Sequence, residues 1–167
     1  MAGSLAGAGG CSLVTVQQSP FPPLEIQAKR PAPPPPRVVL TPSSIQIGDK
    51  VQFAFDSAEI LPASFDLLNE VAGVFTKNPQ IESVQVEGHT DSSGAAQHNK
   101  ELSQKRAESV RAFLIKQGVA AKRLVAKGFG PDRPIADNAT DEGKEKNRRV
   151  EFSIVKQGQI KTLVQDE

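Results

Sequence analysis

The chain has 167 residues, which is enough for one ordinary domain and some additional segments. Hydrophobic residues make up 38% and charged residues 23%, a balance typical of a globular protein and not of a disordered chain or a membrane bundle. Because 20 Lys and Arg face 19 Asp and Glu, the formal net charge is only +1, and we expect no nucleic-acid partner since no strong positive field is available to hold one.

Residues 1–18 are predicted to form a flexible segment around the single cysteine of the chain, Cys11. Small residues from Leu5 to Gly10 precede it, as at the cleavage site of a lipoprotein signal, but a basic start and a full apolar run are missing. Two interpretations stay open: a truncated lipoprotein signal with a lipid on Cys11, or a plain flexible start. No apolar run reaches the roughly 20 residues that cross a bilayer, so this lipid is the only membrane link that we expect.

Residues 19–37 are predicted to form a proline-rich linker. Eight of the thirteen prolines lie between Pro20 and Pro36, where neither a helix nor a sheet ladder can be sustained. At about 3.1 Å per residue, a polyproline conformation of this stretch would span on the order of 50 Å. Such a length suits a tether, and a leader without function is the alternative interpretation.

A folded domain is predicted over residues 49–156, followed by a tail at 157–167, and a hairpin at 38–48 is a further hypothesis. The alternation of Val51, Phe53 and Phe55 predicts a first strand with one face in the core. A helix is predicted to begin at Pro62, because apolar residues then repeat at intervals of three and four as far as Asn78-Pro79.

The second half of the domain is predicted to repeat this pattern. Strands are expected around Val84 and Val86, at 124–127 and from Val150 to Ile154, with a helix over about 99–117. A strand that leaves through a helix normally returns parallel and right-handed, which puts the helices on one face of a mixed sheet. The fold class is therefore an α/β (α+β) two-layer sandwich with the order strand-helix-strand-helix-strand-strand.

One charged residue does not fit the face of its predicted helix. At about 100° per residue, Arg106 falls inside the apolar arc between Leu102 and Ala107. The other charges of the helix fall outside this arc: Glu101, Lys105, Glu108, Arg111 and Lys116. An arginine that points inward stays protonated and needs an anion, so the partner is either an internal carboxylate or an anionic ligand.

A carboxylate is predicted near this arginine. Asp91 follows the second long strand, and Ser92-Ser93-Gly94 leads from it toward the helix that carries Arg106. Ligands of open α/β sheets bind beyond the carboxyl ends of the strands. We therefore expect Asp91 and Arg106 to share one opening.

Several ordered blocks resemble the signature of OmpA C-terminal domains over about residues 49–156. They are Phe53-Ala54-Phe55-Asp56-Ser57, Gly88-His89-Thr90-Asp91-Ser92-Ser93-Gly94, Asn99, Leu102-Ser103, Arg106-Ala107, Gly128-Phe129-Gly130, Pro134-Ile135-Ala136-Asp137-Asn138 and Asn147-Arg148-Arg149-Val150-Glu151-Phe152. Several blocks in order are far more specific than one short motif. The sequence departs from the family pattern at Ala54, where an acidic residue is frequent, and at Lys144, where an arginine is common. Neither change affects Asp91 or Arg106.

The resemblance implies a domain on the periplasmic face of the outer membrane, in the bacterial cell envelope. Such domains bind peptidoglycan without a covalent bond, through the diaminopimelate residue of the stem peptide, and so anchor the outer membrane or an envelope complex to the cell wall. It also implies that Asp91 accepts from the ammonium group of the ligand and that Arg106 holds its carboxylate. Asn99 would add polar contacts, and the remaining residues expected to line the cleft are Phe55, Asp56, Thr90 and Leu102.

Neither enzymatic activity nor a cofactor is predicted, because the chain has no nucleophile elbow and no His-Glu-x-x-His pair. His89 and His98 alone are a weak zinc signal, so no metal is predicted either. Arg148 and Arg149 fit two interpretations, caps of the cleft or solvated strand charges. An envelope scaffold that binds other proteins is the alternative function, and a cell-wall hydrolase is a further one.

Overall fold

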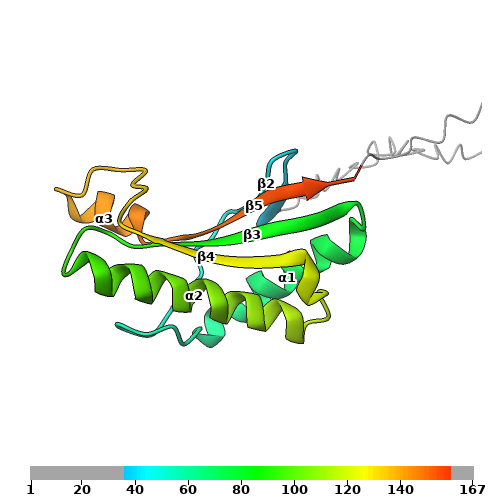
Figure 1. Ribbon diagram of the computed structural model, residues 1–167, viewed down its shortest axis with the longest axis horizontal. Helices are drawn as coiled ribbons and strands as arrows, with labels where there is room; N and C mark the ends of the chain where they lie inside the picture. The colour runs from blue at the N-terminus through cyan, green and yellow to red at the C-terminus, as the bar shows by residue number, and fades with distance from the viewer. Residues whose placement is uncertain (1–35, 159–167) are drawn as a thin grey trace, which may run out of the picture. The chain divides into compact units, whose positions relative to one another are not determined.

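The computed structural model describes residues 36–158 (Figure 1). The predicted flexible segment with Cys11, most of the predicted linker at 19–37 and most of the predicted tail at 157–167 lie outside this range. In the described residues, no helix is both long enough and apolar enough to span a membrane.

Five strands form one mixed sheet in the order β1-β2-β5-β3-β4. Their bounds are β1 (Val38–Leu40), β2 (Ser44–Ile47), β3 (Ile81–His89), β4 (Leu124–Gly130) and β5 (Val150–Gln157). Strands β1 and β2 form an antiparallel hairpin, β5 pairs antiparallel with both β2 and β3, and β3 pairs parallel with β4. The parallel pair is joined through a helix, as parallel strands require.

Three α-helices and two short 3-10 turns complete the described domain. They are η1 (Pro62–Ser64), α1 (Phe65–Lys77), α2 (Ala96–Lys116), η2 (Ala121–Arg123) and α3 (Asp141–Asn147). Figure 1 shows α1 and α2 against one face of the sheet and α3 near one end of it. The predicted two-layer fold with its helices on one face is thus confirmed.

The core lies between the sheet and the two long helices. Val84 and Val86 of β3 and Phe152 of β5 are at most 1% exposed and alternate with more exposed neighbours, so every second residue of these strands faces the helices. Helix α1 contributes Phe75, also 1% exposed, and α2 contributes the fully buried Val110. Burial of a large apolar side chain of this kind stabilises the fold by roughly 1.5–3 kcal/mol.

Helix α2 lies directly against the backbone of β3 and β4 because two glycines leave room for it. A Cβ atom on Gly88 would lie 2.2 Å from the carbonyl oxygen of Ser103, and one on Gly128 would lie 2.3 Å from the backbone nitrogen of Gln104. The hydroxyl of Ser103 fills the remaining space and accepts from the backbone N–H of Gly130 at 2.8 Å. This close approach fixes α2 relative to the end of β3, where Asp91 follows.

The predicted first strand at 51–55 is wrong. Only one isolated bridge forms there, between Phe53 and Ile60, and the loop between them turns at Asp56, whose φ of 47° is in the left-handed region. Val51 is buried as expected, but Phe55 is fully exposed. The place beside β5 is occupied by β2 of the hairpin, and the segment instead forms a loop that lines the cleft at the end of β3.

Candidate functional site

A cleft of about 990 Å³ lies at the end of β3. Its walls come from residues 50–56, from the turn after β3, from the first half of α2 and from the junction between α3 and β5. All seven residues predicted to bind ligand line this cleft, namely Phe55, Asp56, Thr90, Asp91, Asn99, Leu102 and Arg106. Sequence patterns and motif resemblance therefore selected side chains that the fold brings together from three separate segments.

Asp91 is held in a fixed turn at the floor of the cleft. Its side chain accepts from the backbone N–H of Ser93 at 2.9 Å and from Nη1 of Arg148 at 2.5 Å. Asn99, buried on α2, donates to the carbonyl oxygen of Ser93 at 2.7 Å and so ties the turn to the helix. Burial raises the pKa of Asp91, but the hydrogen bonds from Ser93 and Arg148 outweigh burial and lower it. The carboxylate is therefore ionised at neutral pH.

Arg106 is half-buried, and its charge has no acidic partner within 4.0 Å among the described residues. Its Nε donates to the carbonyl oxygen of Ser57 at 2.9 Å, and its guanidinium lies over the ring of Phe53 at 5.0 Å. Burial lowers the pKa of this arginine, and the nearby Asp56 carboxylate opposes that change. Neither Nη atom donates to an acceptor in the described part of the chain, so two donors remain available to an anion.

Helix α2 presents Arg106 at the margin of its buried face and not at its centre. The buried residues of the helix are Asn99, Ser103, Ala107, Val110 and Leu114. Two of these residues, Asn99 and Ser103, are polar. An arc drawn through apolar residues alone omits them and is therefore shifted toward Arg106. Of the two partners left open for Arg106, an internal carboxylate within 4.0 Å is absent from the described residues.

Arg148 is the main component of the cleft to which the sequence assigned no definite role. It pairs with Asp91 and with Glu145 of α3, and Nζ of Lys50 lies 2.9 Å from the carboxylate of Glu145. The pairing with Asp91 raises the pKa of Arg148. Of the two interpretations left open for this residue, the structure supports the one at the cleft.

Asn147 organises the loop that approaches the cleft from the other side. It is fully buried, and its Oδ1 accepts from the backbone N–H groups of Ile135 and Ala136 at 2.8 and 3.0 Å. Its Nδ2 donates to Oδ1 of Asn138 at 2.9 Å, and that oxygen also accepts from the backbone N–H of Ser92 at 3.2 Å. The amide thus connects the loop after β4 to the turn that holds Asp91. Only its place in the Asn147-Arg148-Arg149 block signals it in the sequence.

The rim of the cleft combines an apolar and a charged element. The ring of Phe55 is fully exposed, and the carboxylate of Asp56 lies 2.8 Å from Nε2 of His98 at the start of α2. Deeper in the cleft, the hydroxyl of Thr90 is buried and has no hydrogen-bond partner among the described residues. The cleft therefore has an exposed ring at its mouth and, beneath its surface, a buried hydroxyl without a partner next to Asp91.

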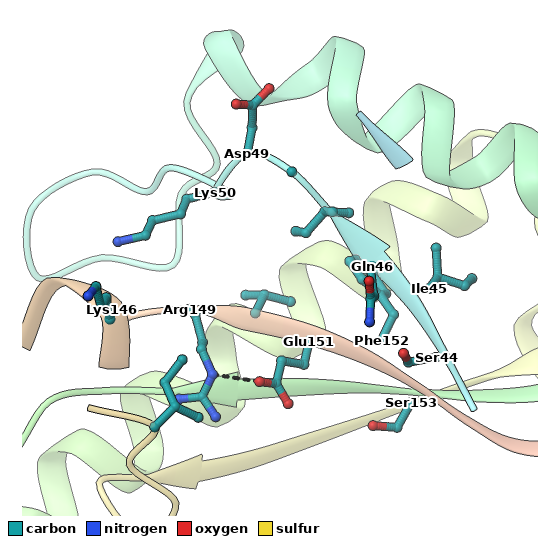
Figure 2. Close-up of a pocket in the computed structure, with 14 residues that line it drawn as sticks. Ser44, Ile45, Gln46, Asp49, Lys50, Lys146, Arg149, Glu151, Phe152 and Ser153 are labelled. Atoms are coloured by element: carbon teal, nitrogen blue, oxygen red, sulfur yellow. Dashed lines mark hydrogen bonds and ion pairs between the residues drawn. The ribbon is translucent and has the colours of Figure 1, made fainter. Parts of the chain in front are cut away.

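A second cavity, of about 530 Å³, borders β2 and β5 (Figure 2). Ser44, Gln46 and Ser153 line it, and Figure 2 shows Arg149 turned toward Glu151, with which it forms a hydrogen bond of 2.6 Å. None of the seven predicted ligand-binding residues lines this cavity. The cleft beyond β3 is therefore the candidate site.

The fold and the cleft define a two-layer α/β domain with a charged site at one end of its sheet. The chain belongs to the OmpA family, whose model matches residues 52–148. This match contains every residue predicted to bind ligand.

Relatives in sequence include outer-membrane proteins and lipoproteins. Outer membrane porin F of Pseudomonas fluorescens is 44% identical over 109 residues, covering 65% of this chain and 33% of the porin. The probable lipoprotein YiaD of Escherichia coli is 44% identical over 110 residues, 66% of this chain and 50% of that protein. Peptidoglycan-binding protein ArfA of Mycobacterium tuberculosis is 39% identical over 107 residues, 64% of this chain and 32% of that protein. The chain thus spans half or less of the length of these relatives.

Solved structures show the same fold. The cell wall anchor of the T6SS from Pseudomonas aeruginosa superposes with a TM-score of 0.60 at 32% identity, covering 72% of this chain and 89% of that chain. The peptidoglycan-associated lipoprotein from Burkholderia pseudomallei gives a TM-score of 0.57 at 31% identity, covering 64% of this chain and 90% of that chain. Together with the sequence relatives, these matches confirm the predicted location in the bacterial cell envelope.

Proposed function

We propose that this domain binds peptidoglycan without a covalent bond, through the diaminopimelate residue of the stem peptide, and thereby anchors the outer membrane or an envelope complex to the cell wall. The single observation that carries the proposal is the half-buried guanidinium of Arg106, which has free Nη donors in the same cleft as the carboxylate of Asp91. The relatives named as peptidoglycan-binding protein, peptidoglycan-associated lipoprotein and cell wall anchor support it.

The free end of the diaminopimelate side chain is a zwitterion, which matches this pair of charges. Its carboxylate would accept two hydrogen bonds from the Nη atoms of Arg106, and its ammonium group would donate to Asp91. Hydrogen bonds to charged groups contribute roughly 1.5–3 kcal/mol each, and an unpaired charge is costly to bury. A ligand without charged groups would leave Arg106 without an anion and would bring no cation to Asp91, so the cleft favours a zwitterion.

Binding would alter the ion pair between Asp91 and Arg148. A carboxylate has about four lone-pair positions, so the ligand ammonium can join the guanidinium on Asp91 or displace it. Arg148 is 43% exposed and keeps a second partner in Glu145, so it can move without losing all of its hydrogen bonds. The cleft would thus exchange one cation for another at little electrostatic cost.

The other cleft residues would contact the rest of the stem peptide. The buried hydroxyl of Thr90 lacks a partner and would bond the ligand close to Asp91. Asn99 holds the turn that carries Asp91, and Leu102 forms apolar wall on the same helix. Phe55 and Asp56 would contact the ligand at the rim.

Co-sedimentation with isolated cell-wall sacculi tests this function. We expect the variants Asp91→Ala and Arg106→Ala to remain folded and to bind about ten- to a hundredfold more weakly, the loss of one charge-assisted contact. Lys105→Ala is the matched control, because this exposed lysine lies next to Arg106 on α2 outside the cleft. Wild-type binding by both cleft variants would remove the basis of the proposal.

Free diaminopimelate, added as a competitor, tests the ligand separately from the wall. It should release the wild-type domain from sacculi, whereas cadaverine, which has two ammonium groups but no carboxylate for Arg106, should do so much less well. If both compounds competed equally well, the proposal that the domain binds the wall would stand. The assignment of diaminopimelate as the ligand would be contradicted. A lipid on Cys11, found by mass spectrometry of the protein from its native membrane, would place the domain at the periplasmic face of the outer membrane.

A further inference from the structure

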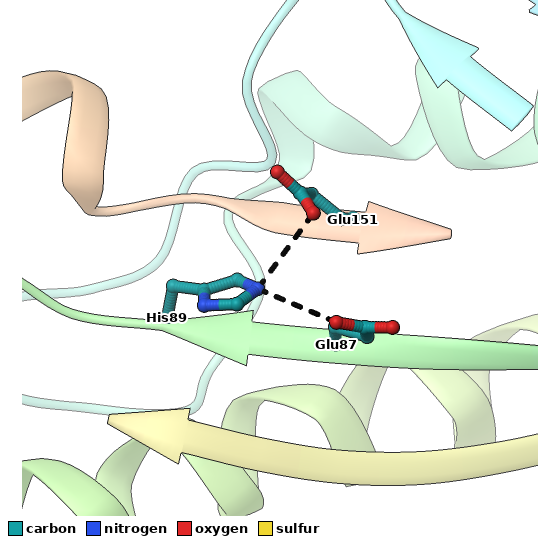
Figure 3. A group of neighbouring side chains, drawn as sticks. All are labelled: Glu87, His89 and Glu151. Carbon is teal, nitrogen blue, oxygen red and sulfur yellow. Dashed lines mark ion pairs between the residues drawn. The ribbon is translucent and has the colours of Figure 1, made fainter. Parts of the chain in front are cut away.

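Three side chains from β3 and β5 converge beside the cleft. None of them is among the residues proposed to bind the wall, although His89 also borders the cleft. Figure 3 shows the ring of His89 directed toward the carboxylates of Glu87, on the same strand, and of Glu151, on β5. Glu87 and Glu151 are direct partners in the antiparallel register of the two strands. Like charges directly opposite each other on neighbouring strands destabilise a sheet, so this arrangement favours a cation between them.

His89 is a buried imidazole, a common metal ligand, and it has no hydrogen-bond partner among the described residues. Its side chain is 1% exposed, and neither ring nitrogen has a hydrogen-bond partner in the part of the chain that the structure describes. Nε2 lies 3.8 Å from Oε2 of Glu87 and 3.9 Å from Oε2 of Glu151, which is too far for hydrogen bonds. The ring stacks on Phe129 with 5.4 Å between centroids, so it is held in place by packing.

The second oxygen of each carboxylate is engaged elsewhere, which directs the first toward His89. Oε1 of Glu87 accepts from Nε2 of Gln85 at 3.0 Å, and Oε1 of Glu151 accepts from Nε of Arg149 at 2.6 Å. Hydrogen bonds of this kind from a second layer of residues orient the ligands of metal sites. One oxygen of each carboxylate and one imidazole nitrogen lie within 4.8 Å of one another.

We propose that Glu87, His89 and Glu151 form a binding site for a divalent transition-metal ion of the zinc type. One imidazole and two carboxylates are a ligand set that suits Zn²⁺, whereas Ca²⁺ and Mg²⁺ prefer oxygen ligands alone. Tetrahedral Zn²⁺ at about 2.0–2.1 Å from nitrogen and oxygen keeps its ligands about 3.4 Å apart. The ligand atoms lie within 4.8 Å of one another, so each would move by up to about 0.7 Å. Glu151 is 44% exposed, which leaves a fourth position open to water.

Two arginines compete with the ion, and the geometry limits their effect. Arg149 binds the oxygen of Glu151 that faces away from His89. Arg133 reaches Oε2 of Glu87 only at 3.5 Å, is 58% exposed and stacks on Phe129, so it can withdraw from the carboxylate without losing that stacking contact. Two carboxylates would balance the charge of the ion, which would link the neighbouring strands β3 and β5.

Direct zinc titration of the full chain tests the site. The protein is first treated with a chelator and kept reduced, and ZnCl₂ binding is then measured by competition with a chromophoric chelator. We expect one ion per chain, together with a rise in the melting temperature. Glu151→Gln and Glu87→Gln should each weaken zinc binding at least tenfold, and Glu151→Gln is the safer variant because its side chain is partly exposed.

Two control variants separate this site from other zinc ligands of the chain. His98→Gln removes the second histidine, which pairs with Asp56 at the cleft rim, and Cys11→Ser removes the thiol. Both should bind zinc as the wild type does. The proposal is overturned if the wild type binds no zinc, if both glutamate variants bind it normally, or if either control loses it. None of these outcomes bears on binding to sacculi.

Discussion

Nη1 of Arg148 donates to Oδ2 of Asp91 at 2.5 Å, so the carboxylate in the cleft has an internal cation. The guanidinium of Arg106, in the same cleft, has no acidic partner within 4.0 Å in the described residues. The two charges of a zwitterionic ligand therefore meet unequal conditions. Its carboxylate would pair with the guanidinium of Arg106, which has no anion. Its ammonium group would replace the guanidinium of Arg148 on Asp91.

The first prediction follows from this asymmetry. Arg148→Ala should keep wall binding within about threefold of the wild type, because the ligand ammonium replaces the lost guanidinium on Asp91. Without ligand, the same variant should lose about 1 kcal/mol of stability, a value discounted for the exposure of Arg148. Co-sedimentation and urea unfolding measure the two quantities. A loss of binding as large as that of Arg106→Ala would show that Arg148 contacts the ligand itself.

The second prediction concerns acid stability in the presence of a metal chelator. Burial lowers the pKa of His89 to about 4 from its ordinary value of 6.5, with Arg149 adding to the effect. Between these values the unfolded chain binds the extra proton, so the free energy of unfolding should fall as the pH falls from 6.5 to 4, by on the order of 3 kcal/mol from this group.

Urea unfolding at several pH values measures this contribution against a His89→Gln variant. The variant should lose stability less steeply across the same window, because only the ordinary carboxylates remain to titrate. Parallel curves for the two proteins would contradict a neutral buried imidazole.

The third prediction tests the contact between α2 and the sheet. Gly88→Ala should destabilise the domain by about 3 kcal/mol or more, because its Cβ would lie 2.2 Å from the backbone oxygen of Ser103, which cannot move without shifting the helix. Gly73→Ala is the matched control. No atom lies within 4 Å of its added Cβ, so this change within α1 should stabilise by about 1 kcal/mol. Thermal unfolding of both variants distinguishes crowding from helix propensity.

The fourth prediction concerns the buried amide of Asn147. Asn147→Ala removes the acceptor of the Ile135 and Ala136 N–H groups and should cost about 2–4 kcal/mol, since buried donors are left unpaired. Hydrogen exchange at these two amides should accelerate more than at the core strands. Lys146→Ala, at the exposed neighbouring position, should change neither quantity. Unchanged exchange at Ile135 and Ala136 would show that the loop does not depend on this side chain.

The central pair of the candidate site could be predicted from the sequence because its signals are local. The position of Arg106 on its helix follows from a period of 3.6 residues, and the place of Asp91 follows from the rule for the ends of strands. The remaining cleft residues came from motif resemblance. All of them line the same cleft, although Phe55 does so from a loop and not from a strand.

The error at 51–55 has a physical cause. Alternation of Val51, Phe53 and Phe55 shows that a segment can form a strand, but not which segment takes the place beside β5. In this fold β2 already pairs with β5. The segment therefore turns at Asp56 and places the ring of Phe55 in solvent.

Contacts between distant segments could not be predicted from one sequence. The pairing of Arg148 with Asp91 depends on how the junction of α3 and β5 passes the end of β3. Likewise, Glu151 meets His89 only because β5 runs antiparallel to β3 in one particular register. The sequence-based expectation of no metal considered the two histidines alone and so could not include these carboxylates.

The shortness of β1 has a mechanical consequence for an anchor. Tension between the proposed wall contact and the predicted linker would enter the sheet at β1, which pairs with β2 through three residues only. The cleft lies at the end of β3, a strand with neighbours on both sides. Under load β1 would separate from β2 first and lengthen the tether, while β2 and the cleft residues that follow it stayed in place.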